Sequence, residues 1–205
     1  MSKGWDFDTG SGGGSNVEYT KFPEGITKIR VVDATPNIRW IHWINSLKRS
    51  INCPGRGCPI CEMRKNEKAN KMEYTHNMSR RFALQVLNRN TGKLEMMEQG
   101  VTFFQDLKDL MEMLDEKGKK LIDVDISVKR RGSGKDNTSY RLDIDEEYPL
   151  TDADKKLIEG MVDMDEYFKV HEPEKIIRVL QGEDWKEVMY DEEVEDDKEE
   201  EFELE

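Results

Sequence analysis

Alternating apolar and polar positions predict that residues 26–148 form a small, mainly β body. Alternation with a period of two is typical of strands that have one buried face. It appears in six short segments of this region, at residues 28–31, 38–44, 81–87, 93–97, 124–128 and 140–144. Asn and Gly residues between the third and fourth segments suit a hairpin turn, so these two strands are expected to pair.

Apolar residues with helical spacing appear once inside this body. Between residues 101 and 116 they recur at steps of three and four, which predicts an amphipathic helix that ends at Gly118. These residues are Phe103, Leu107, Leu110, Met111 and Leu114. A second, mostly polar helix is expected at residues 62–73. The fold class is therefore mainly β with α.

The chain divides into four parts. Residues 1–25 are rich in Gly and Ser and are expected to form a flexible arm. Residues 26–148 form the body, with an insert at residues 45–78 that contains all three Cys. Residues 149–190 are expected to be an acidic helical extension. Residues 191–205 have few apolar side chains to bury and are expected to be a disordered acidic tail.

Two helices are expected in the acidic extension. Thr151 is a candidate N-cap because Asp154 follows three positions later, as in a capping box. Apolar residues then continue with helical spacing to Val162, and a second short helix is expected from Glu174 to Leu180.

Charges are unevenly distributed along the chain. The 205 residues include 32 Lys and Arg and 44 Asp and Glu, a formal net charge of −12. Residues 26–143 nevertheless hold 23 basic and 15 acidic residues, whereas residues 191–205 hold 1 basic and 11 acidic residues. Phosphate binding depends on the local field rather than on the whole-chain sum, so this pattern predicts a polyanion-binding body with an acidic tail.

Three Cys in the insert predict a metal site. Cys53, Cys58 and Cys61 have the spacing Cys-x4-Cys-x2-Cys, and the Gly and Pro between them favour tight turns. An odd, tightly spaced set of Cys is a poor disulfide framework and indicates a reducing compartment. Two thiolates three positions apart can bind one tetrahedral ion, so we expect one structural Zn2+.

A structural zinc site needs a fourth ligand. We favour His42, because a strand fixes its direction and an imidazole inside an aromatic cluster needs a partner. His76 is the alternative, as is an acidic ligand or none from the protein. Three reduced thiols without metal are the other interpretation.

Basic and aromatic residues are interleaved along the predicted strands and predict a nucleic-acid interface. Cations bind phosphates, whereas aromatic rings stack on bases that are not paired in a duplex, so single strands are the favoured ligand. The register of this strand decides whether Trp40 or Trp43 meets a base. Trp43 shares a strand face with Arg39 and is the favoured stacking residue, whereas Trp40 on the other face is the candidate core residue. The candidate DNA-binding residues are Arg30, Arg39, Trp43, Lys48, Arg49, Arg81, Phe82, Lys129, Arg130, Arg131, Tyr140 and Arg141.

Five stretches within residues 27–143 carry a resemblance to a known family. They are Ile29-Arg30-Val31-Val32-Asp33, Trp40-Ile41-His42-Trp43, Cys53-Pro54-Gly55-Arg56-Gly57-Cys58-Pro59-Ile60-Cys61-Glu62, Glu98-Gln99-Gly100 and Lys129-Arg130-Arg131-Gly132-Ser133-Gly134. With the strand order and the inserted Cys segment, they resemble the single-stranded DNA-binding (helix-destabilising) proteins of T-even-like and related tailed bacteriophages.

This resemblance implies an OB-fold barrel and an acidic C-terminus that recruits replication and recombination proteins. It also implies zinc ligands in the family's chain order, namely His42, Cys53, Cys58 and Cys61. The spacing from His to Cys is shorter here than in the family. The family's arm is basic and mediates cooperative self-association, whereas residues 1–25 here have a net charge of −2. Only weak self-association on DNA is therefore expected.

The predicted function is to coat and protect single-stranded DNA during phage replication, recombination and repair, in the cytoplasm of the infected bacterial host. No apolar run approaches the roughly 20 residues of a membrane helix, so no membrane is expected. The alternative is a zinc-stabilised adaptor that acts through its acidic C-terminus. Catalysis is not expected, because zinc deaminases need His-x-Glu and Pro-Cys-x-x-Cys, and His42 is followed by Trp43-Ile44.

Overall fold

A computed structural model describes residues 17–33, 35–134, 137–145 and 149–189. Its seven strands form one antiparallel sheet in the order β3-β2-β4-β1-β6-β7, with β5 paired to β4. The strands are β1 (Gly25–Val31), β2 (Asn37–Ile44), β3 (Arg49–Asn52), β4 (His76–Asn88), β5 (Lys93–Gln99), β6 (Asp125–Arg131) and β7 (Ser139–Ile144). The helices are α1 (Pro59–Ala69), α2 (Val101–Asp115), α3 (Asp152–Ile158), α4 (Met164–Tyr167), α5 (Pro173–Leu180) and α6 (Trp185–Met189), with a 3-10 turn η1 at Leu121–Asp123.

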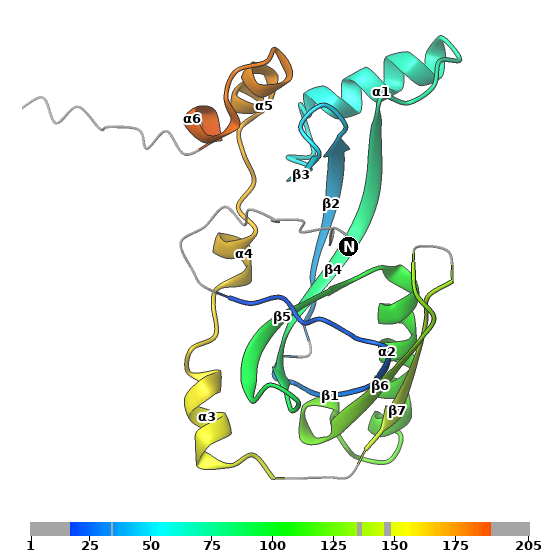
Figure 1. Cartoon of the computed structure of the whole chain (residues 1–205), viewed down its shortest axis with the longest axis vertical. Coiled ribbons are helices and arrows are strands. Elements are labelled where there is room, and N and C mark those ends of the chain that lie inside the picture. The colour runs from blue at the N-terminus through cyan, green and yellow to red at the C-terminus, as the bar shows by residue number, and fades with distance from the viewer. Residues whose placement is uncertain (1–16, 34, 135–136, 146–148, 190–205) are drawn as a thin grey trace, which may run out of the picture.

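Strand β4 joins two lobes. Its first half pairs with β2, and its second half pairs with β1 and β5. In Figure 1, β2 and β4 rise out of a lower body and carry β3 and α1 at their far end. We call β1, β5, β6, β7, α2 and the second half of β4 the lower body, and β3, α1, α5, α6 and the adjoining ends of β2 and β4 the upper lobe.

The lower body has its core between the sheet and α2. The residues of the predicted amphipathic helix pack there, with Phe103, Leu107 and Leu114 buried against β-strand residues such as Ile29 and Ile126. Burial of one apolar stripe explains why this 15-residue segment is a helix. The prediction of this helix is confirmed almost to the residue.

The upper lobe has a separate core that the C-terminal extension completes. Ile44, Ile51 and Ile60 come from β2, β3 and α1, and they pack against Ile176 and Val179 of α5. Figure 1 shows the extension running along one side of the molecule, from α3 beside the lower body, past α4, to α5 and α6 in the upper lobe.

The six predicted strands are all present, and β3 is an additional strand that the sequence did not reveal. Its four residues, Arg49–Asn52, are too few to show a period, and they pair with β2 only because the chain turns back after Ile44. The polar helix begins earlier than predicted, at Pro59, because a proline fits the first turn of a helix.

The extension also differs in part from its prediction. Thr151 and Asp154 form the expected capping box, with Thr151 Oγ1 accepting a hydrogen bond from the Asp154 amide at 3.1 Å. Helix α3 nevertheless ends at Ile158, so Met161 and Val162 lie outside it. The short helices α4 and α6 show no periodicity in the sequence because each has at most five residues.

The last part of the expected flexible arm is paired with the sheet. Tyr19 bridges Met96 of β5, and the Thr20 amide donates to the Met96 carbonyl at 2.8 Å. Phe22 is buried in the lower-body core. Residues 17–22 therefore belong to the body, whereas residues 1–16 and the acidic tail at 191–205 lie outside the described part of the chain.

None of the helices that the structure describes combines the length and the apolar character needed to cross a lipid bilayer.

Arg30, a candidate DNA-binding residue, has a structural role instead. It is 1% exposed, and its Nε lies 2.5 Å from Asp125 Oδ1. Arg89 binds the other oxygen of Asp125 at 3.0 Å and also binds Asp154 of α3 at 2.7 Å. Asp125 thus connects β1 and β6 and, through Arg89, the C-terminal extension. A buried, paired guanidinium is not available to a phosphate.

Replacement of Asp125 by Asn should destabilise the protein strongly, because it leaves the buried Arg30 charge without its carboxylate. We expect a loss of about 3 to 5 kcal/mol in the free energy of unfolding, measured by urea denaturation. Asp143→Asn is the control, because its partner Arg141 is solvent-exposed and such pairs contribute only about 0 to 1 kcal/mol. Equal effects of the two substitutions would contradict the structural role of Asp125.

Candidate metal centre and nucleic-acid interface

One imidazole and three thiols meet in the upper lobe. The ligand atoms of His42, Cys53, Cys58 and Cys61 all lie within 4.8 Å of one another. His42 Nε2 is 3.4 Å from Cys58 Sγ and 3.5 Å from Cys61 Sγ, and Cys53 Sγ is 3.6 Å from Cys61 Sγ. His42 and Cys58 are fully buried. The cluster could hold one metal ion.

Short-range structure explains why these four residues converge. His42 lies on β2 opposite Ile51 of β3, and Cys53 directly follows β3, where its amide donates to the Trp40 carbonyl at 2.8 Å. Gly55 and Gly57 both have positive φ, at 77° and 80°, and so turn the chain tightly toward α1. Cys58 is then the N-cap of α1 and Cys61 lies in its first turn.

The donor set fits a tetrahedral ion with soft ligands. Two sulfur atoms bound at about 2.3 Å to one zinc ion would lie about 3.8 Å apart, close to the separations observed here. Burial and the neighbouring thiols raise the pKa of Cys61 to about 12, and burial raises the pKa of Cys58. A cation among the sulfur atoms would offset this cost of ionising them. Burial, together with Arg64 and His76, lowers the pKa of His42 and favours the neutral imidazole that a metal needs.

His76, the alternative ligand, lies outside the cluster. It is buried at the start of β4, and its carbonyl accepts a hydrogen bond from Arg64 of α1. Its position therefore anchors α1 to β4, and of the two candidate histidines the structure brings only His42 to the thiols.

The candidate DNA-binding residues of the upper lobe lie near the C-terminal extension. Arg39 Cζ is 3.3 Å from the centroid of the Phe168 ring, and Arg39 also binds Glu98. Arg49 Cζ is 5.6 Å from the Trp185 ring. Two of the predicted cations are thus held by aromatic rings of residues 149–189. Trp43 is half-buried and shares the strand face of Arg39, whereas Lys48 is exposed in the turn before β3.

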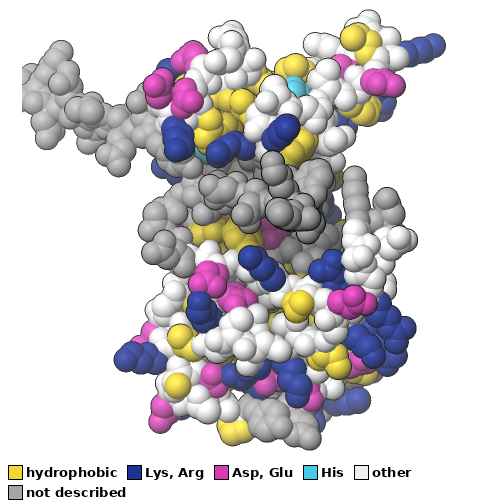
Figure 2. Space-filling model, viewed as in Figure 1, with side chains coloured by type: hydrophobic (Ala, Val, Ile, Leu, Met, Phe, Trp, Pro, Cys, Tyr) yellow, Lys and Arg dark blue, Asp and Glu magenta, His cyan; other side chains and the backbone are white. Residues whose placement is uncertain are grey.

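A second group lies on β6 and β7 of the lower body. Lys129 and Arg141 are directly opposite each other, and Arg131 is exposed at the end of β6. In Figure 2, dark blue side chains gather on the side of the lower body where Figure 1 places these strands. Arg130 and Tyr140 instead support the fold. Arg130 donates to the Phe22 carbonyl at 2.6 Å, and the Tyr140 ring packs edge-on against Phe103. The structure thus brings the predicted cations together in two groups.

Phe82 and Trp40 exchange their expected roles. Phe82 is only 8% exposed, and its ring stacks on Phe104 with centroids 5.2 Å apart, so it belongs to the core. Trp40 is 47% exposed, so its assignment to the core is wrong. Arg81, on the face opposite to Phe82, is half-buried with its Nε 3.9 Å from Glu98. The sequence favoured Trp43 over Trp40 and left Arg80 out of the candidate residues, and only the strand register reveals that Trp40 lies opposite the exposed Arg80.

No family model matches the chain. The chain is 26% identical over 159 residues to a protein of Escherichia phage T5 that is named a probable ssDNA-binding protein. This chain is similar to a phage single-stranded DNA-binding protein. The match covers 68% of the chain and 59% of the T5 protein. The resemblance to phage proteins of this class is confirmed, and the narrower T-even-like type stays a prediction.

Replacement of His42 by Gln should abolish tight metal binding, because it removes the only imidazole ligand of the described cluster. Zn2+ affinity, measured by competition with a chromophoric chelator, should fall by at least about 100-fold, since even outer-shell changes cost 10- to 100-fold. His76→Gln is the matched control and should retain one ion per chain. Loss of the ion in the control, or its retention in His42→Gln, would contradict the ligand set.

Proposed function

We propose that this protein binds and coats single-stranded DNA without catalysing a reaction. The observation that carries the proposal is the antiparallel pair of β2 and β4, which β3 and α1 connect and which we call the β2–β4 hairpin. It combines Arg39, Trp40, Trp43, Arg80 and Arg81 and ends at the cluster of His42 and three Cys. Cations that follow a backbone and rings that accept unpaired bases are the chemistry of single-strand binding. The name of the T5 relative supports the same ligand.

We propose Zn2+ as the ion and an OB-type barrel as the body. Thiolate and imidazole ligands in a closed, four-ligand site favour structural zinc. The lower body supports the barrel, because β1 pairs with both β4 and β6, and α2 lies between β5 and β6 along the chain. Small OB-fold barrels are Greek-key sheets of five strands that bind oligonucleotides. The division into an arm, a body with a zinc insert, an acidic helical extension and an acidic tail is part of this proposal.

The proposed setting is phage replication, recombination and repair in the cytoplasm of the infected host. The acidic tail at residues 191–205 would recruit replication and recombination proteins, because a segment in which 11 of 15 residues are acidic offers a charged docking site. Weak self-association on DNA is part of the same proposal. An adaptor that acts only through this tail would not need the cations and exposed rings of the hairpin.

Binding to a single-stranded oligonucleotide should weaken steeply with salt. The logarithm of affinity falls by about 0.7 per neutralised phosphate, so four to seven contacts should give a slope of roughly −3 to −5 against the logarithm of salt concentration. Fluorescence anisotropy of labelled oligo(dT) measures this slope, and a duplex of equal length is the control. Equal affinity for the oligonucleotide and the duplex, or no binding at low salt, would overturn the proposal. The adaptor that acts through the acidic tail would then be the remaining function.

Removal of residues 191–205 should strengthen oligonucleotide binding, because the tail's negative charges repel phosphates and compete for the cations. The change should be largest at low salt and should vanish above about 0.5 M, where charges are screened within a few ångströms. The same anisotropy titration measures it. An unchanged affinity at low salt would show that the tail does not compete.

A further inference from the structure

One side of the β2–β4 hairpin presents exposed apolar and basic side chains. Ile38, Trp40, Met78 and Arg80 point to this side because successive strand residues alternate and Trp40 is directly opposite Arg80. Ile38 is 48%, Trp40 47% and Met78 38% exposed. We call these four residues the Trp40 face.

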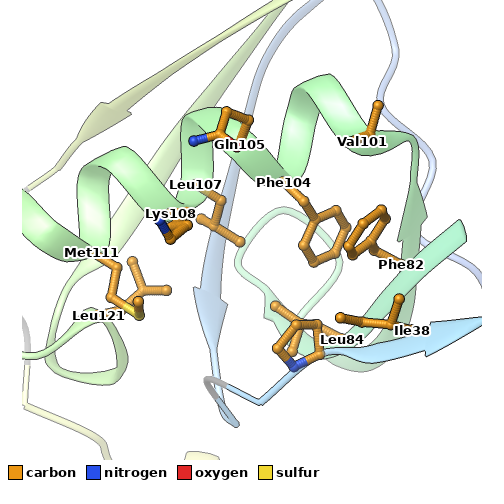
Figure 3. A pocket seen from close by; sticks show the side chains of 11 residues that line it. Ile38, Phe82, Leu84, Val101, Phe104, Gln105, Leu107, Lys108, Met111 and Leu121 are labelled. Atoms are coloured by element: carbon orange, nitrogen blue, oxygen red, sulfur yellow. The ribbon is translucent and has the colours of Figure 1, made fainter. Parts of the chain in front are cut away.

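An apolar pocket of about 260 Å³ adjoins the Trp40 face. Figure 3 shows Phe82 of β4 beside Phe104 of α2, with Ile38 of β2 next to Phe82 and Lys108 further along the helix. Ile38 lines the pocket and also flanks Trp40, so the two features form one surface. Arg80 Cζ lies 5.1 Å from the Phe82 ring and therefore stands beside the pocket.

The charges of this surface are positive. Its ionisable side chains are Arg80 on the Trp40 face and Lys108 in the pocket, and no carboxylate is among the described residues of either. Many other cations of the described chain contact carboxylates, as Arg39 and Arg81 do with Glu98 on the opposite side of the same strands. An exposed indole beside a guanidinium, next to an apolar pocket, matches a planar base joined to a phosphate.

The part of the C-terminal extension around α4 binds the opposite side of the hairpin, whereas α5 packs against Ile44 at the far end of the same side as Trp40. Asn37 and Arg39 face that side, where Asn37 Nδ2 donates to Asp165 at 3.1 Å and Arg39 contacts Phe168. Trp40 stays exposed in the same structure. A ligand can therefore reach the Trp40 face while the extension remains docked.

The metal cluster fixes the position of Trp40. The Trp40 carbonyl accepts the Cys53 amide at 2.8 Å, and His42 follows two residues later on the same strand face. Because the backbone of Trp40 is held between two of the proposed metal ligands, its indole ring loses little conformational freedom when it stacks on a base.

We propose that the Trp40 face is a nucleotide-binding site for single-stranded DNA. One unpaired base stacks on Trp40, Arg80 binds the adjoining phosphate, and the neighbouring base enters the pocket between Ile38 and Phe104. This inference rests on the proposed function and assigns it to the side of the hairpin opposite to Trp43, the stacking residue that the sequence favoured.

The test compares Trp40→Ala with Tyr74→Ala in the full-length, zinc-loaded protein. Tyr74 is a matched control, because it is also an exposed aromatic of the same lobe and packs on an arginine, with Arg64 Cζ 4.0 Å from its ring. Anisotropy titration with labelled oligo(dT) should show about 5- to 150-fold weaker binding for Trp40→Ala and an unchanged salt slope. Trp40→Phe should recover most of the affinity, whereas Tyr74→Ala should bind as the wild type does.

Arg80→Gln gives a second, independent readout. It should make the salt slope shallower by about 0.7, because one phosphate contact is lost. Metal content and thermal midpoint, measured for each variant, identify loss of folding, and Arg80→Gln retains the test if Trp40→Ala unfolds. If Trp40→Ala and Arg80→Gln both bind with wild-type affinity, this site is overturned but the proposed function stays intact. The same follows if binding is lost only in Trp43→Ala. Absence of binding by the wild type would overturn both.

Discussion

Pairing of one long strand with different partners along its length holds the two lobes together. The 13 residues of β4 bind β2 near the cluster of His42 and three Cys and bind β1 and β5 in the lower body. Because backbone hydrogen bonds continue along the strand, the register that aligns Trp40 with Arg80 is the same register that sets Phe82 into the core. A slip by one residue would exchange the two sides of the hairpin, so the core and the exposed ring depend on one constraint.

Local patterns predicted the elements of this fold well. The stripe of apolar residues gave helix α2, alternation gave six strands, and the pair Thr151 and Asp154 gave the start of α3. The ligand set was also accessible from the sequence, because Cys spacing is a local signal and a strand histidine upstream has a fixed direction. These features depend on neighbours within a few residues.

Features that depend on distant partners could not be predicted. From its neighbours in the sequence, Arg30 looks like any exposed basic residue on a strand. Its burial depends on Asp125, which lies 95 residues later in the chain and opposite Arg30 in the sheet. Trp40 and Phe82 share one side of the β2–β4 hairpin, so which of them is buried depends on how far along the strands α2 covers that side, and Phe104 of α2 stacks on Phe82. The same holds for Arg39 and Arg49, whose aromatic partners Phe168 and Trp185 belong to the extension.

The upper-lobe core also bears on the order in which the chain acquires its structure during translation. Ile44, Ile51 and Ile60 are made early, but their apolar partners in α5 and α6 leave the ribosome only after the whole lower body. Until then, the insert has few apolar contacts of its own to offset the entropy of ordering it. Capture of a metal ion by the nascent loop would supply that missing stabilisation and would link metal supply to the timing of synthesis for this lobe.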